Sequence, residues 1–181
     1  INRFLTRPSL THETLWNEVE RYIEKRSGWL ILDDTVIDKI HSKQIGLTHY
    51  QWSGKHHKVV KGIGLITLVW TDGINTFPID YRIYDRDGDE MSKNDQFREM
   101  VTTASTRGFQ PYFVMFDSWY SGIDNLKWVS KLGWNWFFPY QKEQNSESGR
   151  YGEPSGLPCD SGRRIDHPYE EIRICPPVSF G

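Results

Sequence analysis

Two short apolar segments of this chain each run directly into an aspartate, and this arrangement limits the folds available to it. "GWLILDDT" covers residues 28–35, and "YFVMFDSWYSG" covers residues 112–122. Short, continuous apolar runs of this kind predict strands that are buried on both faces. A buried strand that ends on a carboxylate places it at the carboxyl edge of the sheet, where open α/β sheets bind ligands. The pattern therefore predicts an α/β fold with acidic side chains at one sheet edge.

Further elements are expected around these two strands. Apolar residues recur at helical spacing over residues 11–26, which predicts a first helix. "TDG" at residues 71–73 separates two strand-like runs and predicts a β-hairpin, with Pro78 placing the second strand at an edge or a bulge. The remaining expected elements are strands over residues 56–70, 74–84 and 134–138 and helices over residues 92–104 and 121–132. This order predicts a mixed sheet with helices packed on it.

Composition changes along the chain. All eight tryptophans lie within residues 1–144, whereas Gly, Pro and Ser crowd residues 145–181. We therefore predict a folded core over 1–144 and an irregular, disordered tail over 145–181. Both cysteines lie in that tail, and the absence of cysteine from residues 1–144 fits a reducing cytosol. No apolar run approaches a membrane span of about 20 residues. The net charge of −2 means that any nucleic-acid contact must come from a local basic patch.

The paired aspartates indicate a metal site. Neighbouring carboxylates repel and raise each other's pKa unless a cation neutralises them. Mg²⁺ prefers such oxygen ligands, and two ions about 4 Å apart hold the attacking and leaving oxygens of a phosphodiester displacement. For Asp117 the alternative is a helix cap, since Asp is a favoured N-cap. At the first strand, alternation places Asp33 and Asp34 on opposite faces, so we expect one of them to reach the metal.

"LILDDT", the hairpin that follows it, and "VMFDSWYS" leading into "LKWVSKLGWNWFF" resemble the catalytic core of DDE transposases from cut-and-paste insertion sequences. The resemblance covers about residues 10–144 and implies an RNase H-like mixed α/β sheet with flanking helices. It implies catalytic roles for Asp33 or Asp34 and for Asp117. Asp33 and Asp117 would bind Mg²⁺ or Mn²⁺. In this family the first carboxylate is often followed, one residue later, by Ser or Thr, and the run Asp33-Asp34-Thr35 therefore favours Asp33 as that carboxylate.

The resemblance also implies a biological setting. Such enzymes cleave DNA at transposon ends and join the freed 3′-hydroxyl to target DNA, so the implied partners are transposon-end and target DNA. The same resemblance implies a homodimer in the DNA complex. It also implies a bacterial, nucleoid-associated place in the cytoplasm, with no membrane involved.

The third acid of the family, a Glu on a downstream helix with Tyr, Arg and Lys, has no recognisable counterpart. The glutamates beyond the last expected strand are Glu143, Glu147, Glu153, Glu170 and Glu171. None lies in a helical pattern with Tyr and Arg at the family's spacing, so we expect a fold that is truncated or frame-broken at its C-terminus. The alternatives are a catalytically dead DNA-binding or structural remnant and another RNase H-like nuclease.

One basic segment is a candidate DNA contact. Residues 41–61 carry Lys55, Lys58 and Lys61 among four histidines and two aromatic residues. Basic and aromatic groups together suit phosphates and unstacked bases, and the alternative is a solvated hairpin face. Beside Asp117, we expect Trp119 and Tyr120 to be core residues.

Overall fold

The computed structural model describes residues 11–41, 45–54, 56–85, 88, 90–140, 163–166 and 171–175, and for residues 139–140, 163–166 and 171–175 it describes the backbone alone. Within these residues the strands form one mixed sheet in the order β2-β3-β1-β5-β6-β8-β7, with β4 paired to β3. The strands are β1 (Trp29–Asp38), β2 (His49–Ser53), β3 (Lys58–Thr71), β4 (Thr76–Tyr84), β5 (Phe113–Phe116), β6 (Trp136–Tyr140), β7 (Arg163–Asp166) and β8 (Glu171–Cys175). The helices are α2 (His12–Val19), α3 (Lys93–Thr106) and α4 (Ile123–Lys131), with 3₁₀ turns η1 (Glu20–Tyr22) and η2 (Ser118–Tyr120).

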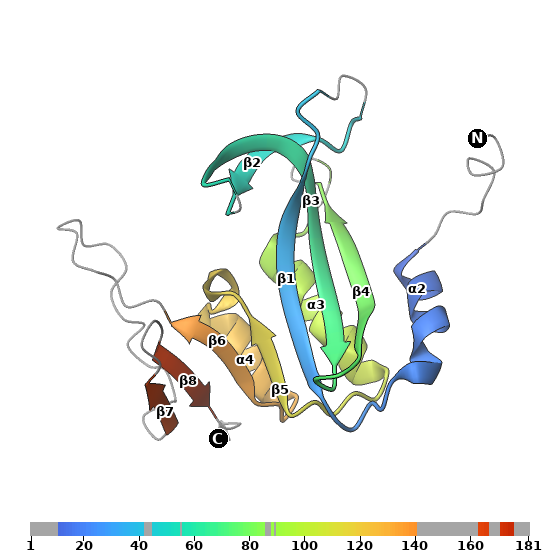
Figure 1. Cartoon of the computed structure of the whole chain (residues 1–181), viewed down its shortest axis with the longest axis vertical. Coiled ribbons are helices and arrows are strands. Elements are labelled where there is room, and N and C mark those ends of the chain that lie inside the picture. Colours follow the sequence, from blue (N-terminus) through green and yellow to red (C-terminus); the bar gives the residue numbers. More distant parts are fainter. Residues whose placement is uncertain are drawn as a thin grey trace.

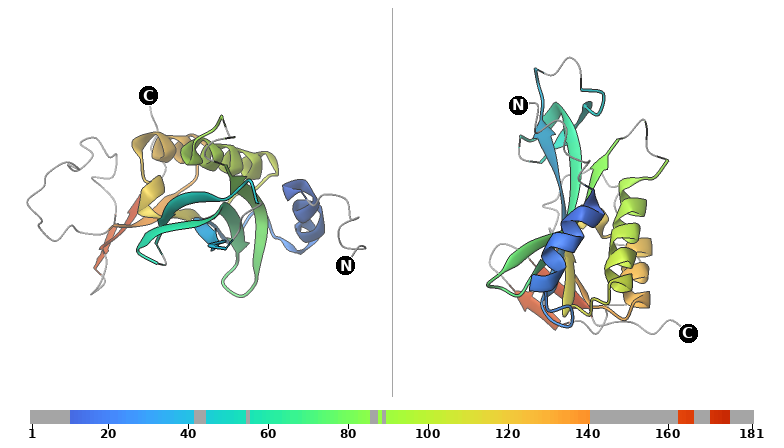
Figure 2. Two further views of the ribbon diagram at one scale, coloured as in Figure 1. Left: turned by 90° about the horizontal axis from the view of Figure 1, so that it is seen from above. Right: turned by 90° about the vertical axis from the view of Figure 1, so that its right-hand side faces the viewer.

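The central part of the sheet has the order β4-β3-β1-β5-β6 (Figure 1). β3 and β4 continue antiparallel from β1, whereas β5 and β6 run parallel to it after the crossovers through α3 and α4. Both crossover helices cover the same face of the sheet, as the side view in Figure 2 shows. The chain therefore has the predicted RNase H-like mixed α/β fold.

The helices begin where the sequence provides caps. Ser92 and Asp95 form a reciprocal capping box at the start of α3, as predicted, and Thr11 does the same with Thr14 at α2. The first helix is shorter than predicted, because the chain tightens into η1 after Val19 and becomes extended at Ile23. The core lies between the sheet and the helices and includes Trp70, Trp136, Phe97, Leu30 and Leu32, all almost fully buried.

β3 changes partners along its length. Residues 62–71 pair with β1 on one edge, while the other edge pairs with β4 over residues 64–71 and with β2 over residues 58–62. The predicted hairpin at 71–73 is confirmed, and Pro78 lies at the expected irregularity of register opposite Val69. At Gly62 an added Cβ would lie 2.6 Å from the carbonyl oxygen of Ile37, so only glycine fits where β3 passes β1.

Two strands were not predicted in the segment expected to be an irregular tail. β8 pairs antiparallel with β6, and β7 pairs antiparallel with β8. The other residues after Tyr140 lie outside the described residues, and the domain boundary near residue 145 stays a prediction. Within the described chain, none of the helices has the length and apolar character needed to cross a bilayer.

Candidate active site

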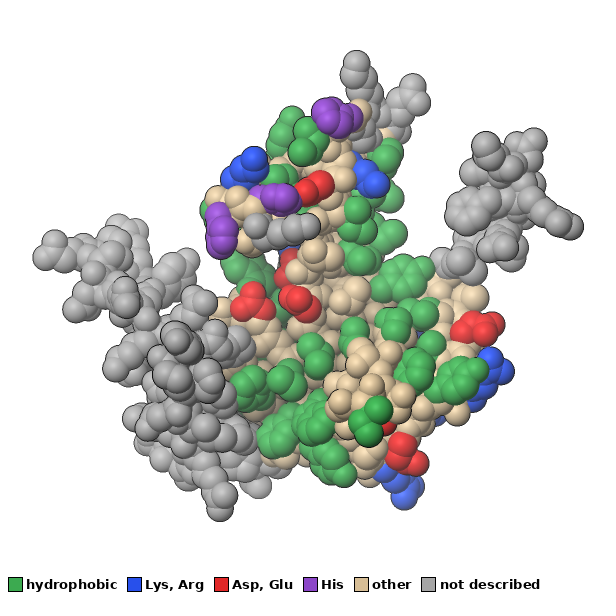
Figure 3. All heavy atoms as spheres, viewed as in Figure 1, with side chains coloured by type: hydrophobic (Ala, Val, Ile, Leu, Met, Phe, Trp, Pro, Cys, Tyr) green, Lys and Arg blue, Asp and Glu red, His purple; other side chains and the backbone are tan. Residues whose placement is uncertain are grey.

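The two strands that carry the aspartates lie side by side and run parallel, as predicted. The prediction that the first strand ends on Asp33 is wrong, because pairing with β3 continues β1 to Asp38. Leu32 of β1 pairs with Phe116 of β5, so the next residues along the two strands are Asp33 and Asp117. Equivalent positions on parallel neighbours project from the same face of a sheet. Asp33 and Asp117 are both exposed, and Figure 3 shows acidic side chains gathered below the histidines on this face of the molecule.

Asp34 points to the other face of β1 and is already paired. The Lys93 ammonium, at the start of α3, donates to one Asp34 carboxylate oxygen at 2.6 Å. The Tyr120 hydroxyl donates to the other at 3.2 Å. The two adjacent aspartates therefore differ in their side-chain partners. Asp34 has a cation and a hydroxyl as partners, whereas Asp33 accepts a hydrogen bond from the Asp34 backbone N–H at 2.8 Å.

The electrostatics of this edge indicate uncompensated negative charge. Partial burial raises the pKa of the Asp33 carboxyl above its ordinary value, and the charges of Asp34 and Asp117 raise it further, although the hydrogen bond from the Asp34 N–H opposes them. Burial and the same carboxylates also raise the pKa of the Tyr120 hydroxyl. Tyr120 therefore keeps its proton and remains a donor to Asp34.

Asp117 begins the turn η2 but does not cap it through its side chain. Its backbone carbonyl accepts from the Tyr120 N–H at 2.9 Å, whereas the carboxylate makes no capping hydrogen bond. One carboxylate oxygen accepts from the neighbouring Ser118 hydroxyl at 3.0 Å. The Asp117 side chain therefore does not cap the turn that follows it, and the capping alternative is wrong.

A family model described as DDE superfamily endonuclease matches residues 6–169. The chain belongs to this superfamily. No curated protein matches it.

Two solved transposase structures are similar to this DDE superfamily endonuclease. One is the piggyBac transposase in a synaptic complex with hairpin DNA, with a TM-score of 0.47 and 11% identity over 85% of this chain and 34% of that one. The other is the Drosophila P element transposase in a strand transfer complex, with a TM-score of 0.28 and 11% identity over 61% of this chain and 22% of that one. The chain thus spans about a third and about a fifth of the length of these two transposases.

DDE superfamily nucleases generally use divalent metal ions. Asp33 and Asp117 fit such an ion in part, because they offer carboxylate oxygens and their mutual repulsion favours a bound cation. Among the described residues no group of three or more His, Cys, Asp or Glu side chains is arranged to hold a metal. Of the five downstream glutamates, Glu171 lies in β8, where the backbone alone is described, and the others lie outside the described residues.

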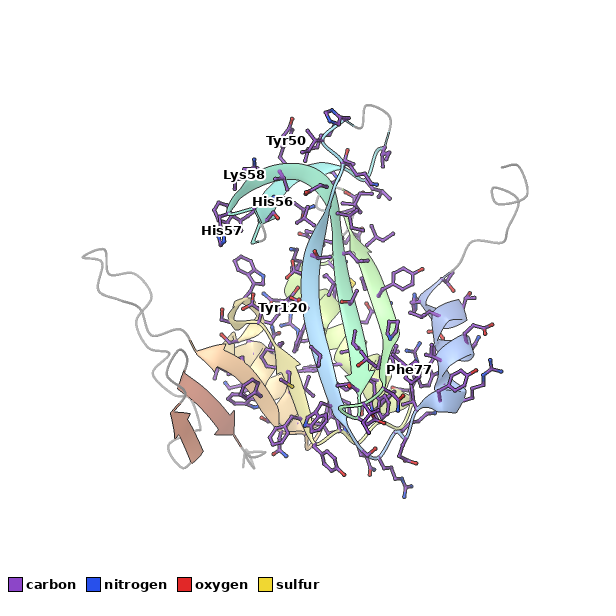
Figure 4. All side chains as sticks on the ribbon, viewed as in Figure 1. Tyr50, His56, His57, Lys58, Phe77 and Tyr120 are labelled. Atoms are coloured by element: carbon purple, nitrogen blue, oxygen red, sulfur yellow. The ribbon has the colours of Figure 1, made fainter. Side chains whose placement is uncertain are left out.

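The β2–β3 hairpin curls over the region of η2, in which Tyr120 lies (Figure 4). Lys58 is exposed beside its turn, Lys61 is half-buried within β3, and Lys55 lies outside the described residues. Two histidines tie the hairpin to the sheet: His56 Nε2 lies 2.5 Å from Asp38, and His49 Nε2 lies 2.8 Å from Asp85. These contacts orient the basic turn, although the role of the three lysines stays a prediction.

The expectation that Trp119 is a core residue is wrong. Tyr120 is fully buried, as expected, but Trp119 is 68% exposed. The 3₁₀ turn η2 explains the difference, because successive residues of a helix with three residues per turn point about 120° apart.

Proposed function

We propose that this chain is the metal-dependent catalytic core of a DNA transposase, which cleaves transposon-end DNA and transfers the freed strand to a target. The observation that carries the proposal is the register of β1 and β5, which brings Asp33 and Asp117 to adjoining positions on one face. Membership of the DDE superfamily of endonucleases supports the same reaction class.

Asp33 and Asp117 are the side chains that would hold Mg²⁺ or Mn²⁺. When bound, such ions neutralise the charge that develops on the phosphodiester and supply a metal-activated nucleophile. Asp34 has a positioning role, because its ion pair with Lys93 joins the middle of β1 to the first turn of α3. Tyr120 strengthens this connection from η2, three residues before α4 begins.

DNA contact is assigned to the β2–β3 hairpin. The carboxylates alone would repel a phosphate backbone, so a nearby source of positive charge is needed. Lys58 is exposed at the start of β3, next to the turn of the hairpin, which curls over the part of the molecule that contains Tyr120 (Figure 4). Lys61 lies three residues further along β3, opposite Tyr50 of β2. We assign phosphate contacts to Lys58 first and to Lys61 second.

The test is a thermal melt of the full chain with increasing Mg²⁺ or Mn²⁺. A cation that binds the native state alone raises the melting temperature. Asp117→Asn should abolish this rise and leave the metal-free protein as stable as before or slightly more so, because one repulsive charge is removed. Asp124→Asn, an exposed carboxylate in the first turn of α4, is the matched control and should keep the rise.

A second arm measures cleavage of duplexes that carry transposon-end sequences. Cleavage should require the metal and should be lost in Asp33→Asn and in Asp117→Asn. A metal-induced rise that survives both substitutions would refute the assignment of these two residues as ligands. A chain that binds DNA but shows neither a metal response nor cleavage would favour the catalytically dead DNA-binding remnant.

A further inference from the structure

Asn125 is a buried amide side chain in the first turn of α4, with an exposed fraction of 2%. Its Oδ1 accepts from the Arg98 guanidinium at 2.8 Å. Its Nδ2 donates to Asn94 Oδ1 at 2.8 Å and to the Tyr120 carbonyl oxygen at 3.0 Å. A rotated amide would turn its NH₂ group towards a guanidinium that has only donors, so these partners fix the orientation of the side chain.

These hydrogen bonds complete a polar ring on the face of β1 opposite to Asp33. Asn94 follows Lys93 in α3, and Lys93 pairs with Asp34 of β1. Asn125 connects Asn94 to the Tyr120 carbonyl, and the Tyr120 hydroxyl donates back to Asp34 at 3.2 Å. The polar ring therefore runs through four elements of the fold, which are β1, α3, α4 and η2.

The polar ring reaches the backbone that carries both candidate metal ligands. On β1, Asp33 is the residue next to Asp34. After β5, the Tyr120 N–H donates to the Asp117 carbonyl at 2.9 Å, and Asn125 holds the carbonyl of the same tyrosine. The β1–β5 ladder ends one residue before the two ligands, so the position of Asp117 depends on η2 as well as on the sheet.

An amide at this buried position is less favourable for burial alone than an apolar side chain. Leu126 and Val129 of the same helix are apolar and lie in the core. A buried amide loses its contacts with water and needs a partner for each polar group. A fully satisfied polar network in turn specifies one arrangement of its members, which is the property that a pair of metal ligands requires.

We propose that Asn125 is a positioning residue, which sets the place of the Asp117 carboxylate relative to that of Asp33 by tying η2 to α3. This inference rests on the proposed function, since it takes these two aspartates as the metal ligands. Without the Asn125 amide, the Tyr120 carbonyl loses a buried donor and η2 loses its connection to α3. The two carboxylates then no longer keep the separation at which they share an ion.

The first measurement is the Mn²⁺ dissociation constant of the full chain, from the electron paramagnetic resonance signal of free Mn²⁺. Asn125→Ala and Asn125→Asp should each weaken binding by about 10- to 100-fold, the range found when partners that orient metal ligands are removed. Asn125→Asp keeps the shape but places an oxygen where a donor faces the Tyr120 carbonyl. Asn94→Ala breaks the same ring at a half-buried position and should also weaken binding, which provides a test if the Asn125 variants do not fold.

Ser130→Ala is the matched control. Ser130 is another buried polar residue of α4, and its hydroxyl accepts from Trp136 Nε1 at 3.1 Å. This contact lies outside the polar ring, so Ser130→Ala should lower the melting temperature but leave the Mn²⁺ dissociation constant unchanged. An equal loss of Mn²⁺ affinity in Ser130→Ala, or no loss in Asn125→Ala, Asn125→Asp and Asn94→Ala, would overturn the inference.

A closed ring also predicts losses that do not multiply. Tyr120→Phe opens the polar ring at Asp34, so adding Asn125→Ala to it should weaken Mn²⁺ binding by less than the product of the two separate fold-changes. Losses that multiply would overturn the polar ring as the unit that positions Asp117.

Amide hydrogen exchange without metal separates this inference from the proposed function. Asn125→Ala should speed exchange of the Tyr120 amide in the metal-free protein, and Ser130→Ala should not. If exchange responds in this way but Asp33→Asn and Asp117→Asn keep the Mn²⁺ affinity, the proposed metal site fails while the tie between α3 and η2 stands. If the Mn²⁺ affinity follows the two aspartates but not Asn125, the positioning role fails and the proposed function stands.

Discussion

The Lys93 ammonium lies 2.6 Å from the Asp34 carboxylate, on the face of β1 opposite to Asp33. The ring of Tyr84 lies 5.5 Å from the same ammonium, which adds a cation–π contact. A carboxylate that already has a cation gains less from binding a second one. Under the proposed function, this ion pair therefore favours Asp33 over Asp34 as the metal ligand on β1.

Lys93→Met should lower the free energy of unfolding by about 1 kcal/mol, because it leaves the half-buried Asp34 carboxylate without its cation. The double variant Lys93→Met with Asp34→Asn should recover part of this loss. Urea denaturation of the four proteins measures the coupling. Asp34→Asn alone should keep the Mg²⁺-induced rise in melting temperature, and loss of that rise would make Asp34 the ligand instead.

The stability of the metal-free protein should depend on pH through Asp33. Its folded-state pKa is raised, so the native state holds this proton more tightly than the unfolded state does. The contribution of Asp33 to stability therefore falls as pH rises from the ordinary carboxyl pKa of 3.8 through the raised value. Asp33→Asn should be more stable than the natural protein above this window and should lose that advantage below it. Denaturation at a series of pH values measures the difference, and an advantage that is constant with pH would contradict this origin.

Tyr120 should contribute to stability through two separable contacts. Tyr120→Phe keeps the stacking on Phe97 but removes the hydrogen bond to Asp34, and should cost about 1 kcal/mol. Tyr120→Ala also empties a fully buried site and should cost about 3 to 5 kcal/mol. Tyr112→Phe, at an exposed position, should change stability by less than about 0.5 kcal/mol. Equal effects of Phe at the two positions would show that the Tyr120 hydroxyl contributes nothing.

Lys58 should contribute to DNA affinity in a manner that depends on salt. Removing one phosphate contact reduces the slope of log K against log salt by about 1 and weakens binding to all sequences alike. Lys58→Gln should show this change in a salt titration of duplex binding. Lys131→Gln, at the end of α4, is the control and should leave the slope unaltered. A Lys58→Gln slope equal to that of the natural protein would contradict the phosphate contact assigned to Lys58 in the hairpin.

The parts of the fold that follow from local pattern could be predicted. The apolar runs before Asp33 and Asp117 specify buried strands, and the "TDG" turn fixes the hairpin of β3 and β4. β2 was missed because "HYQWS" is short and its alternation is weak; its pairing with β3 is what makes it a strand.

The side-chain partners in the site could not be predicted in the same way. Lys93 reaches Asp34 across 59 positions of sequence, and this contact depends on how α3 packs beneath the sheet. The choice between Asp33 and Asp34 is therefore a tertiary property. Likewise, the exposure of Trp119 depends on the chain entering a 3₁₀ turn after Asp117 instead of beginning α4 at once.

The change of partners along β3 divides that strand into two parts of unequal local stability. Residues 64–71 are paired on both edges, whereas residues 58–60 are paired with β2 alone. Opening the turn that bears Lys58 breaks only the β2 ladder, so its amide hydrogens should exchange with solvent well before those beside Asp33. The end of the β2–β3 hairpin can thus open while β1 and β5, which lead to Asp33 and Asp117, keep their register.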